Sequence, residues 1–530
     1  MLPKDKERIV VEVVQRILDS YGADPIAVEH ALFDTIYEER RRLDTERDRK
    51  RAKKEGSFYT GIYREACRVA PDRQRDLLRK IARNFAEEVS GHFDPRIYQI
   101  STRVVPPALT VLLNTLSPLR LIESLPTGLT TLDDSVEVRG ETEALKKMAA
   151  VGTTVLVPTH SSNLDSIVLG FGLYSLGLPP YSYGAGLNLF DNKLIGFFMR
   201  NLGAYKVDRR KKAKLYKDVL KQYAGCSMEM GYHNLFFPGG TRSRSGKVER
   251  KLKLGLLGRA LDAYAHNVIA RKEKPDIFVV PATINYQLVL EAETLIADFL
   301  KDVGKSRFII EDDEFSRPKR VLDFVQKLFS LNSRIQIVVG KPLDVFGNEV
   351  DADGFSRDSR GRRIDRTRYL QCNGAPGLDQ QRDNEYTREL ARAVSDAYVR
   401  DTMINSTNLV AYVVHSMLLQ RNPDLDLYRL LRTGGRDESF HLPDVYDRAD
   451  RLLIKLRELA ADNEVGLDDT LRRRDTVSVV SEALAHLATY HRVPAVKRRG
   501  DRLFHEDRNL LLFYQNRIEG LGLVDRGTLS

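Results

Sequence analysis

The sequence contains little cysteine and no long hydrophobic run. Its three cysteines, Cys67, Cys226 and Cys372, are far apart and match neither a metal-binding spacing nor a disulfide framework, so we expect a reducing compartment. No uninterrupted apolar run reaches the roughly 18 residues that suggest a transmembrane helix. The opening residues, M-L-P-K-D-K-E-R, lack the pattern of a signal peptide. These absences argue against a disulfide-stapled fold and a spanning helix, and they leave attachment to a membrane face open.

The length and charge of the chain narrow its class. The 530 residues exceed one ordinary hydrophobic core, so we expect two or three domains. With 42% hydrophobic and 30% charged residues, the composition is that of a globular protein. The net charge of +10 and the pI near 9.2 predict an anionic partner. Nucleic acid, an anionic lipid surface and a phosphorylated substrate are all compatible with this charge.

Three regions differ in their hydrophobic pattern. Residues 1–150 have mostly helical apolar spacing, residues 151–345 alternate short apolar runs with helical stretches, and residues 346–530 are again mostly helical. Strand–helix alternation predicts an α/β domain with a largely parallel sheet, whose sites lie beyond the carboxyl ends of the strands. We expect strands at residues 153–158, 234–237, 277–284 and 335–339, and helices at 166–178, 212–224 and 254–265.

Two N-terminal stretches have distinctive composition. Residues 38–54 are dense in charges of both signs, which favours a solvent-exposed helix over a nucleic-acid-binding arm. Residues 104–116 are apolar around two prolines and fit either a buried segment or a membrane-facing one.

The stretch H-S-S-N-L-D, residues 160–165, follows the first predicted strand. The three residues after His160 are types that favour a helix N-cap, so His160 should lie where a strand ends and a helix begins. The Asp165 carboxylate can then reach back to one ring nitrogen of His160. That contact would fix the tautomer while the other nitrogen takes a proton from a substrate hydroxyl. The same pair also occurs in purely structural roles.

The stretch F-F-P-G-G-T-R-S-R-S-G-K, residues 236–247, combines glycines with basic side chains. Glycines let backbone amides approach an anion, and arginines offer forked donors to phosphate oxygens. The candidate phosphate-binding residues here are Gly240, Thr241, Arg242, Ser243 and Arg244. The stretch is not a P-loop, because its glycines are one residue too far apart and Val248 stands where Ser or Thr is required. A basic surface turn is the alternative interpretation.

Four blocks in this order resemble the glycerolipid acyltransferases. V-P-T-H-S-S-N-L-D-S resembles their H-x-x-x-x-D block, and F-P-G-G-T-R-S resembles their third block. Residues 184–210, with A-G-L-N-L-F and L-G-A-Y-K-V-D-R-R, resemble the second block of glycerol-3-phosphate acyltransferases, and V-V-P-A-T-I-N-Y resembles the fourth. Residues 404–412 and 510–518 also resemble the long glycerol-3-phosphate acyltransferases. The resemblance implies an α/β acyltransferase domain at residues 151–345, flanked by helical N- and C-terminal regions.

The resemblance implies a reaction and a set of roles. A fatty acyl group would move from an acyl thioester to the sn-1 hydroxyl of glycerol-3-phosphate, in phospholipid biosynthesis, with no metal and no cofactor. His160 would be the base and Asp165 its orienting partner. The other implied residues hold the acceptor phosphate or, for the proline, support the site: Arg242, Arg244, Arg209, Arg200 and Pro281.

The expected partners follow from the same resemblance and from the charge. The donor would be acyl-CoA or acyl carrier protein, and the acceptor glycerol-3-phosphate or 1-acylglycerol-3-phosphate. The positive charge without a long apolar run predicts peripheral attachment to the anionic cytoplasmic face of a membrane. Nucleic acid is disfavoured, because basic residues are dispersed and no recognition motif is present.

The sequence departs from the family pattern at two places. Gly239 stands where the family has a glutamate that helps organise the phosphate-binding arginines. The second block ends V-D-R-R, whereas I-R-R is common in glycerol-3-phosphate enzymes and I-D-R in enzymes that acylate 1-acylglycerol-3-phosphate. An sn-2 acyltransferase is therefore the first alternative. A catalytically weakened phospholipid- or acyl-carrier-binding protein is the alternative of another class.

Overall fold

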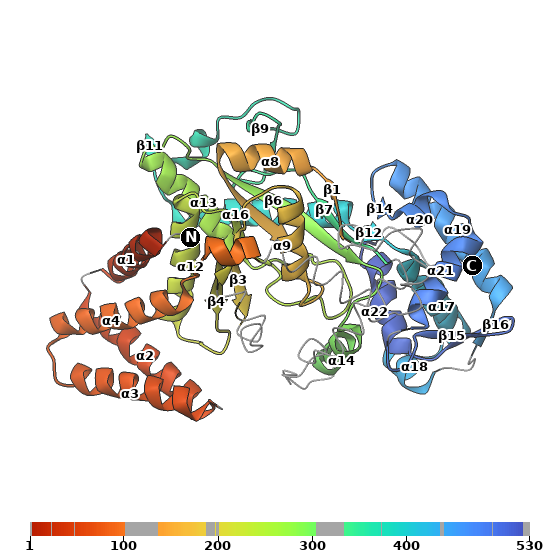
Figure 1. Cartoon of the computed structure of the whole chain (residues 1–530), viewed down its shortest axis with the longest axis horizontal. Helices are drawn as coiled ribbons and strands as arrows, with labels where there is room; N and C mark the ends of the chain where they lie inside the picture. The colour runs from red at the N-terminus through yellow and green to blue at the C-terminus, as the bar shows by residue number, and fades with distance from the viewer. Residues whose placement is uncertain are drawn as a thin grey trace.

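The computed structural model describes residues 3–22, 24–46, 48–100, 136–186, 197, 201–303, 333–372, 374–434, 439–489 and 491–522. The predicted segment 104–116 lies outside the described residues. Figure 1 shows N-terminal helices at one end of the molecule, a large sheet in the middle and C-terminal helices at the other end.

A seven-stranded sheet forms the centre of the structure, in the order β1-β7-β6-β2-β5-β3-β4. The strands are β1 (Val136–Gly140), β2 (Thr153–Pro158), β3 (Ser182–Gly186), β4 (Ala204–Val207), β5 (Asn234–Leu235), β6 (Ile277–Tyr286) and β7 (Ile335–Val339). The strands from β6 to β4 run parallel, and β7 with β1 runs antiparallel to them. The predicted α/β class with a largely parallel sheet is confirmed.

Helices cover this sheet, which explains why its central strands are apolar on both faces. They are α8 (Thr142–Val151), α9 (Asp165–Ser175), α12 (Lys214–Glu229) and α13 (Leu254–Ile269), whereas α14 (Ala292–Val303) packs on the C-terminal helix at residues 508–519. All residues of β2 and β6 are buried. Helix α9 lies close to the sheet at Gly172, where an added Cβ would be 2.7 Å from the Ile337 side chain. At this point α9 packs directly on β7 and β1.

The N-terminal helices are α1 (Pro3–Ser20), α2 (Pro25–Asp44), α3 (Arg49–Ala66) and α4 (Pro71–Val89). Their apolar residues recur at helical spacing, and Ile9, Val13 and Ile17 of α1 are buried. Together with the outer face of α12 they form a second hydrophobic core.

The charge-dense stretch 38–54 does not form one exposed helix, so that prediction is wrong. The chain breaks between α2 and α3, and the Asp48 side chain caps α3. Glu39 and Arg42 are buried, and Lys211 lies 3.3 Å from Glu39. Opposite charges that pair across helices can be buried, which a count of charges along one helix does not reveal.

The C-terminal region is mostly helical, with α16 (Gln380–Asp401), α17 (Ser406–Arg421), α18 (Leu427–Thr433), α19 (Leu442–Ala461), α20 (Asp469–Arg473), α21 (Thr476–Leu487) and α22 (Arg508–Glu519). A 3₁₀ helix (Arg366–Leu370) and short strands accompany them: β8 (Glu349–Val350), β9 (Ser356–Arg357), β10 (Gln371–Cys372), β11 (Ala375–Pro376), β12 (Met403–Ile404), β13 (Ser439–His441), β14 (Gly466–Leu467), β15 (Val496–Arg499) and β16 (Arg502–His505). Helix α16 packs on α13 and β6, while α17 is buried along nearly its whole length between α19, α21 and α22.

Candidate active site

His160 lies on the loop between β2 and α9. β2 ends at Pro158 and α9 begins at Asp165, so the strand-to-helix junction is where the sequence predicts it. The N-cap residue is Leu164, not one of the three residues after His160, so that detail of the prediction is wrong. The Ser162 hydroxyl accepts a hydrogen bond from the Leu164 N–H and satisfies one of the free donors at the helix start.

The buried Asp165 carboxylate accepts hydrogen bonds from all sides of this loop. Its Oδ2 atom lies 2.8 Å from His160 Nδ1 and accepts from the backbone N–H groups of Ser161 at 2.7 Å and Ser162 at 3.0 Å. The Tyr286 hydroxyl donates to Oδ1 at 2.6 Å. A carboxylate that only accepts requires Nδ1 of His160 to carry the proton, which leaves Nε2 with the free lone pair. This is the tautomer that a general base needs.

The His160 ring is held in place and kept neutral. The Phe237 ring stacks on it with 4.1 Å between centroids and 19° between planes. Burial lowers the pKa of His160, whereas the Asp165 carboxylate opposes the shift and the positive charges of Arg242 and Arg209 reinforce it. At neutral pH the imidazole is therefore uncharged and able to accept a proton.

The basic loop after β5 is joined directly to the His160 loop. The Ser243 N–H donates to the His160 carbonyl at 2.7 Å. Gly240 has a φ of +76°, a left-handed conformation that favours glycine, and its N–H donates to the Phe237 carbonyl at 3.0 Å. The turn brings the residues that follow Gly240 to the side of His160.

Arg242 is tied to the His160 loop through Glu291. The fully buried Glu291 accepts from the Ser162 hydroxyl at 2.7 Å and from the Asn163 N–H at 3.0 Å. Its Oε1 atom lies 3.2 Å from Arg242 Nη1. One carboxylate therefore sets the position of the arginine relative to the loop that carries His160.

The other predicted phosphate-binding residues are placed differently. Arg209 follows β4, and desolvation together with the like charge of Arg242 lowers the pKa of its guanidinium. Arg244 forms an ion pair with Asp302 of α14 and is 43% exposed, and Thr241 is exposed. Their phosphate-binding roles stay predictions, with Arg242 and Arg209 as the two cations whose charges act on His160. Arg200 lies outside the described residues.

Pro281 lies inside the buried strand β6, where it is paired with Val157 of β2. Its carbonyl accepts a hydrogen bond from the Gly340 N–H at 2.9 Å. A proline has no N–H group to donate to a neighbouring strand. Pro281 fits its position because the pairing of β6 with β7 begins only at the next residue, Ala282. The position is structural and close to the end of β2.

Sequence reasoning missed two residues of this site, Tyr286 and Glu291, which the C-terminal helices hold in place. Asn405 donates to the Tyr286 carbonyl at 2.9 Å, and Thr407 donates to the Gln287 carbonyl at 2.8 Å. The Tyr514 hydroxyl accepts from the N–H of Val289 at 3.2 Å. The signal that could have found them is the pair of C-terminal stretches, 404–412 and 510–518, because both bind the segment 286–291.

A small cavity of about 30 Å³ lies between the His160 loop and helices α17 and α22. Ser161, Ser243, Tyr286 and Arg517 contribute to its wall. Desolvation lowers the pKa of Arg517 to about 10, against the opposing effect of the Glu249 and Asp165 carboxylates. A polar space of this size holds one or two water molecules.

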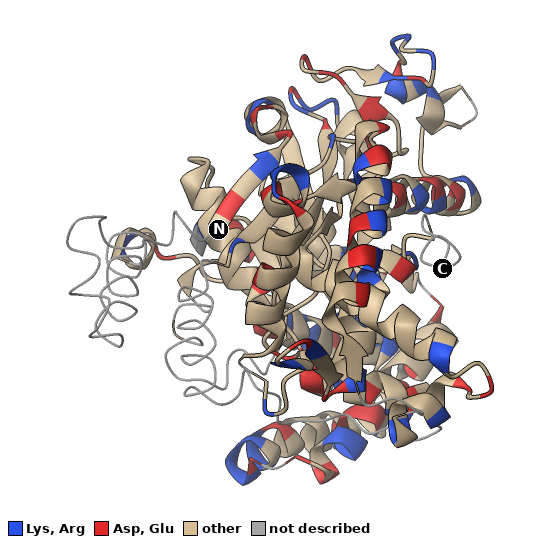
Figure 2. Cartoon of the chain, turned by 90° about the vertical axis from the view of Figure 1, so that its right-hand side faces the viewer, with Lys and Arg blue, Asp and Glu red and all other residues tan. Residues whose placement is uncertain are grey.

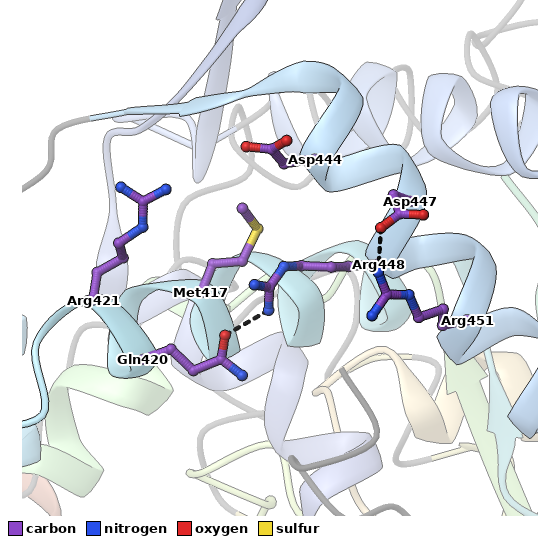
Figure 3. Close-up of a pocket in the computed structure, with 7 residues that line it drawn as sticks. All are labelled: Met417, Gln420, Arg421, Asp444, Asp447, Arg448 and Arg451. Atoms are coloured by element: carbon purple, nitrogen blue, oxygen red, sulfur yellow. Dashed lines mark hydrogen bonds and ion pairs between the residues drawn. The ribbon is translucent and has the colours of Figure 1, made fainter. Parts of the chain in front are cut away.

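A larger hollow of about 290 Å³ lies on the C-terminal region, between α17 and α19 (Figure 3). In its wall, Arg448 of α19 donates a hydrogen bond to Gln420 of α17. Arg451 forms an ion pair with Asp447, one turn away on α19. Its wall carries no histidine, serine or cysteine, so among the described residues the chemistry points to the His160 loop instead.

The described residues contain neither a membrane-spanning helix nor a metal-binding cluster. No helix there is both long and apolar enough to cross a bilayer. Within the same residues, no cluster of three or more His, Cys, Asp or Glu side chains is arranged to bind a metal ion.

Comparison with known proteins agrees with this geometry. The family model named Acyltransferase matches residues 135–285. Glycerol-3-phosphate acyltransferase of Pseudomonas aeruginosa (strain LESB58) is 28% identical over 358 residues, 66% of this chain and 39% of that protein. Dihydroxyacetone phosphate acyltransferase of Bos taurus is 28% identical over 303 residues, 56% of this chain and 40% of that protein. The chain thus spans about two fifths of the length of these curated relatives. Residues 135–285, which carry His160 and the basic loop, therefore match the Acyltransferase family model.

Proposed function

We propose that the chain transfers a fatty acyl group from an acyl thioester to the sn-1 hydroxyl of glycerol-3-phosphate. The observation that carries this proposal is the His160–Asp165 pair beside Arg242. His160 Nε2 takes the hydroxyl proton as that oxygen attacks the thioester carbonyl, and Asp165 stabilises the imidazolium. When the carbon–sulfur bond breaks, the imidazolium returns the proton to the leaving thiolate. The ester and a free thiol are the products.

Binding of the acceptor phosphate fits the charges beside His160. Arg242 and Arg209 both oppose protonation of His160, and each offers a forked set of donors to phosphate oxygens. Glu291 holds the Arg242 guanidinium beside the loop that carries His160. A phosphate bound there would orient the adjacent glycerol hydroxyls toward the base.

In the sequence, the motif V-D-R-R at residues 207–210 favours 1-acylglycerol-3-phosphate as the acceptor. The structure offers another reason for the aspartate of this motif. Asp208 is buried and accepts a hydrogen bond from Arg210, and Arg51 of α3 lies 3.8 Å from it. The aspartate thus has a local role in joining the N-terminal helices to the sheet. This role, together with the names of the relatives above, favours glycerol-3-phosphate over 1-acylglycerol-3-phosphate.

The positive charge of the chain fits substrates and a membrane surface better than nucleic acid. In Figure 2 the positions of Lys and Arg residues are interspersed with those of Asp and Glu residues along the ribbon. We therefore propose peripheral attachment to the anionic cytoplasmic face of a membrane, where the acylated product would accumulate.

A purified-protein assay tests the function. Glycerol-3-phosphate, 1-acylglycerol-3-phosphate and dihydroxyacetone phosphate are offered side by side, each with acyl-CoA and with acyl carrier protein. Acylation of glycerol-3-phosphate at the sn-1 position is the expected result. Turnover of 1-acylglycerol-3-phosphate alone would establish the sn-2 alternative, and binding of lipid without turnover of any acceptor would establish the binding protein.

A further inference from the structure

Gly239 and Glu249 occupy one space in the basic loop. An ideal Cβ atom built on Gly239 would lie 2.6 Å from the carboxyl carbon of Glu249 and 2.5 and 2.6 Å from its two oxygens. Gly239 is not among the glycines with positive φ, so its backbone admits a side chain. The space that this side chain would need is occupied by the carboxyl group of Glu249.

The carboxyl carbon of Glu249 lies about as far from the built Cβ as it would inside a glutamate side chain at position 239, whereas the two oxygens lie closer to Cβ than they would there. Two carbon–carbon bonds of about 1.5 Å that meet at a tetrahedral angle place the carboxyl carbon about 2.5 Å from Cβ. The carboxyl group of Glu249 therefore lies within reach of the place where a glutamate at position 239 would put its own. Position 239 is also where the family resemblance expects a glutamate.

The Glu249 carboxyl lies next to the backbone N–H of His160. Both of its oxygens are buried. Burial raises the pKa of Glu249 to about 8; the backbone amide of His160 and the charge of Arg517 oppose this shift, and the Asp165 carboxylate adds to it. At pH 7 the group is mainly a neutral acid, so it fills the space between Gly239 and His160 without adding a charge.

We infer that Glu249 supplies, from position 249, the carboxyl group that related enzymes place at position 239, and that it positions the basic loop against the His160 loop. This inference rests on the proposed function for its activity readout. Without the carboxyl group a void would separate the two loops, so Arg242 would move relative to His160. The acceptor would then bind more weakly and turn over more slowly.

An exchange of the two residues tests the inference. Glu249→Ala should raise the acceptor KM at least tenfold and lower kcat, with little change in the thioester KM, and it should lower the Tm. The double variant Gly239→Glu/Glu249→Ala should recover most of both losses, because the carboxyl group returns from position 239. Gly239→Glu alone should lower the Tm, since two carboxyl groups then compete for one space.

Two controls separate the possible failures. Glu249→Gln, which keeps the shape of the neutral acid, should keep KM and kcat near the wild-type values at pH 7, and the exposed Glu349→Ala should change neither the kinetics nor the Tm. A double variant no better than Glu249→Ala in either KM or Tm would overturn the inference, as would a Glu249→Ala protein with unchanged values. A wild-type protein without acyltransferase activity would reject the proposed function alone, because the Tm coupling between positions 239 and 249 is measured without substrate.

Discussion

Glu291 and Arg242 form an ion pair of 3.2 Å that joins the loop after β6 to the loop after β5. Because Glu291 also accepts from Ser162, the pair sets the distance between the arginine and the loop that carries His160. Lysine at position 242 would keep the charge and lose the fork that reaches both Glu291 and a phosphate.

Arg242→Lys should therefore weaken acceptor binding more than donor binding. We expect the acceptor KM to rise about tenfold, equivalent to about 1.4 kcal/mol, with the thioester KM nearly unchanged. Arg244→Lys should have a smaller effect because Arg244 pairs with the surface residue Asp302, and the exposed Arg362→Lys serves as the matched control. Steady-state kinetics with each substrate varied in turn measures this. An impaired thioester KM with a normal acceptor KM would move Arg242 to the donor.

His160→Ala should abolish acyl transfer and leave the fold intact. Loss of a general base typically costs about 10²–10⁴ in rate. Asp165→Asn should also lose most activity, because an amide does not stabilise the imidazolium. His441, which is exposed on β13, provides the control His441→Ala. Near-normal turnover by His160→Ala, with an unchanged melting curve, would remove His160 from catalysis.

The pH profile should identify the base. Burial lowers the pKa of His160, so the neutral base persists below its ordinary pKa of about 6.5 and the acidic limb of kcat/KM should lie below that value. Asp165→Asn removes the charge that opposes this shift, and the limb should move to still lower pH. Tyr286→Phe removes a hydrogen bond that the Asp165 carboxylate accepts. The carboxylate then attracts the protonated His160 ring more strongly, so the limb should move to higher pH. Shifts of equal sign in both variants would contradict the arrangement.

Membrane attachment is testable by fractionation. The net charge of +10 predicts binding to anionic vesicles and weak binding to neutral ones. High salt or alkaline carbonate should release the protein, because screening and deprotonation weaken the attraction of basic side chains. Co-sedimentation with vesicles of each composition, at low and high salt, is the measurement. Retention until detergent is added would contradict a peripheral mode.

Local sequence signals predicted the elements that carry the base. The β-branched run at residues 153–158 and the run at residues 335–339 coincide with β2 and β7. Strands that are buried on both faces appear in the sequence as short continuous apolar runs, so they can be recognised locally. The spacing of His160 and Asp165 predicted their contact, since both lie within one loop and one helical turn. In contrast, the predicted helix at 166–178 ends at Ser175, before Gly177, whose φ of +72° ends the turn.

Long-range contacts account for what the sequence did not predict. Tyr286 and Glu291 reach Asp165 and Ser162 from more than one hundred residues away, and the pattern around them has no period that marks them. The burial of Glu39 likewise depends on Lys211, which belongs to another region of the chain. From the sequence, Gly239 indicates only that the glutamate of the family motif is missing. No motif predicts that the carboxyl group of Glu249 lies next to this position.

The ionisation of Glu249 should appear in the pH dependence of stability. In the folded protein burial raises the pKa of Glu249 to about 8, whereas in the unfolded chain the ordinary value near 4.5 applies. Between these values the unfolded state has lost the proton and the folded state has kept it. The free energy of unfolding therefore falls as pH rises, by up to about 1.4 kcal/mol per pH unit for this one group.

Glu249→Gln removes the titration and keeps the shape, so the variant should gain stability relative to wild type as pH rises from 5 to 8. We expect the two proteins to differ little near pH 5 and the variant to have the higher Tm at pH 8, because only wild type must then hold a buried acid against ionisation. Thermal unfolding of both proteins across this range is the measurement, and the difference between them cancels the contributions of other buried acids. A difference in Tm that stays constant with pH would mean that Glu249 is ionised in the folded protein, and its carboxylate would then need a buried cation such as Arg517 as its partner.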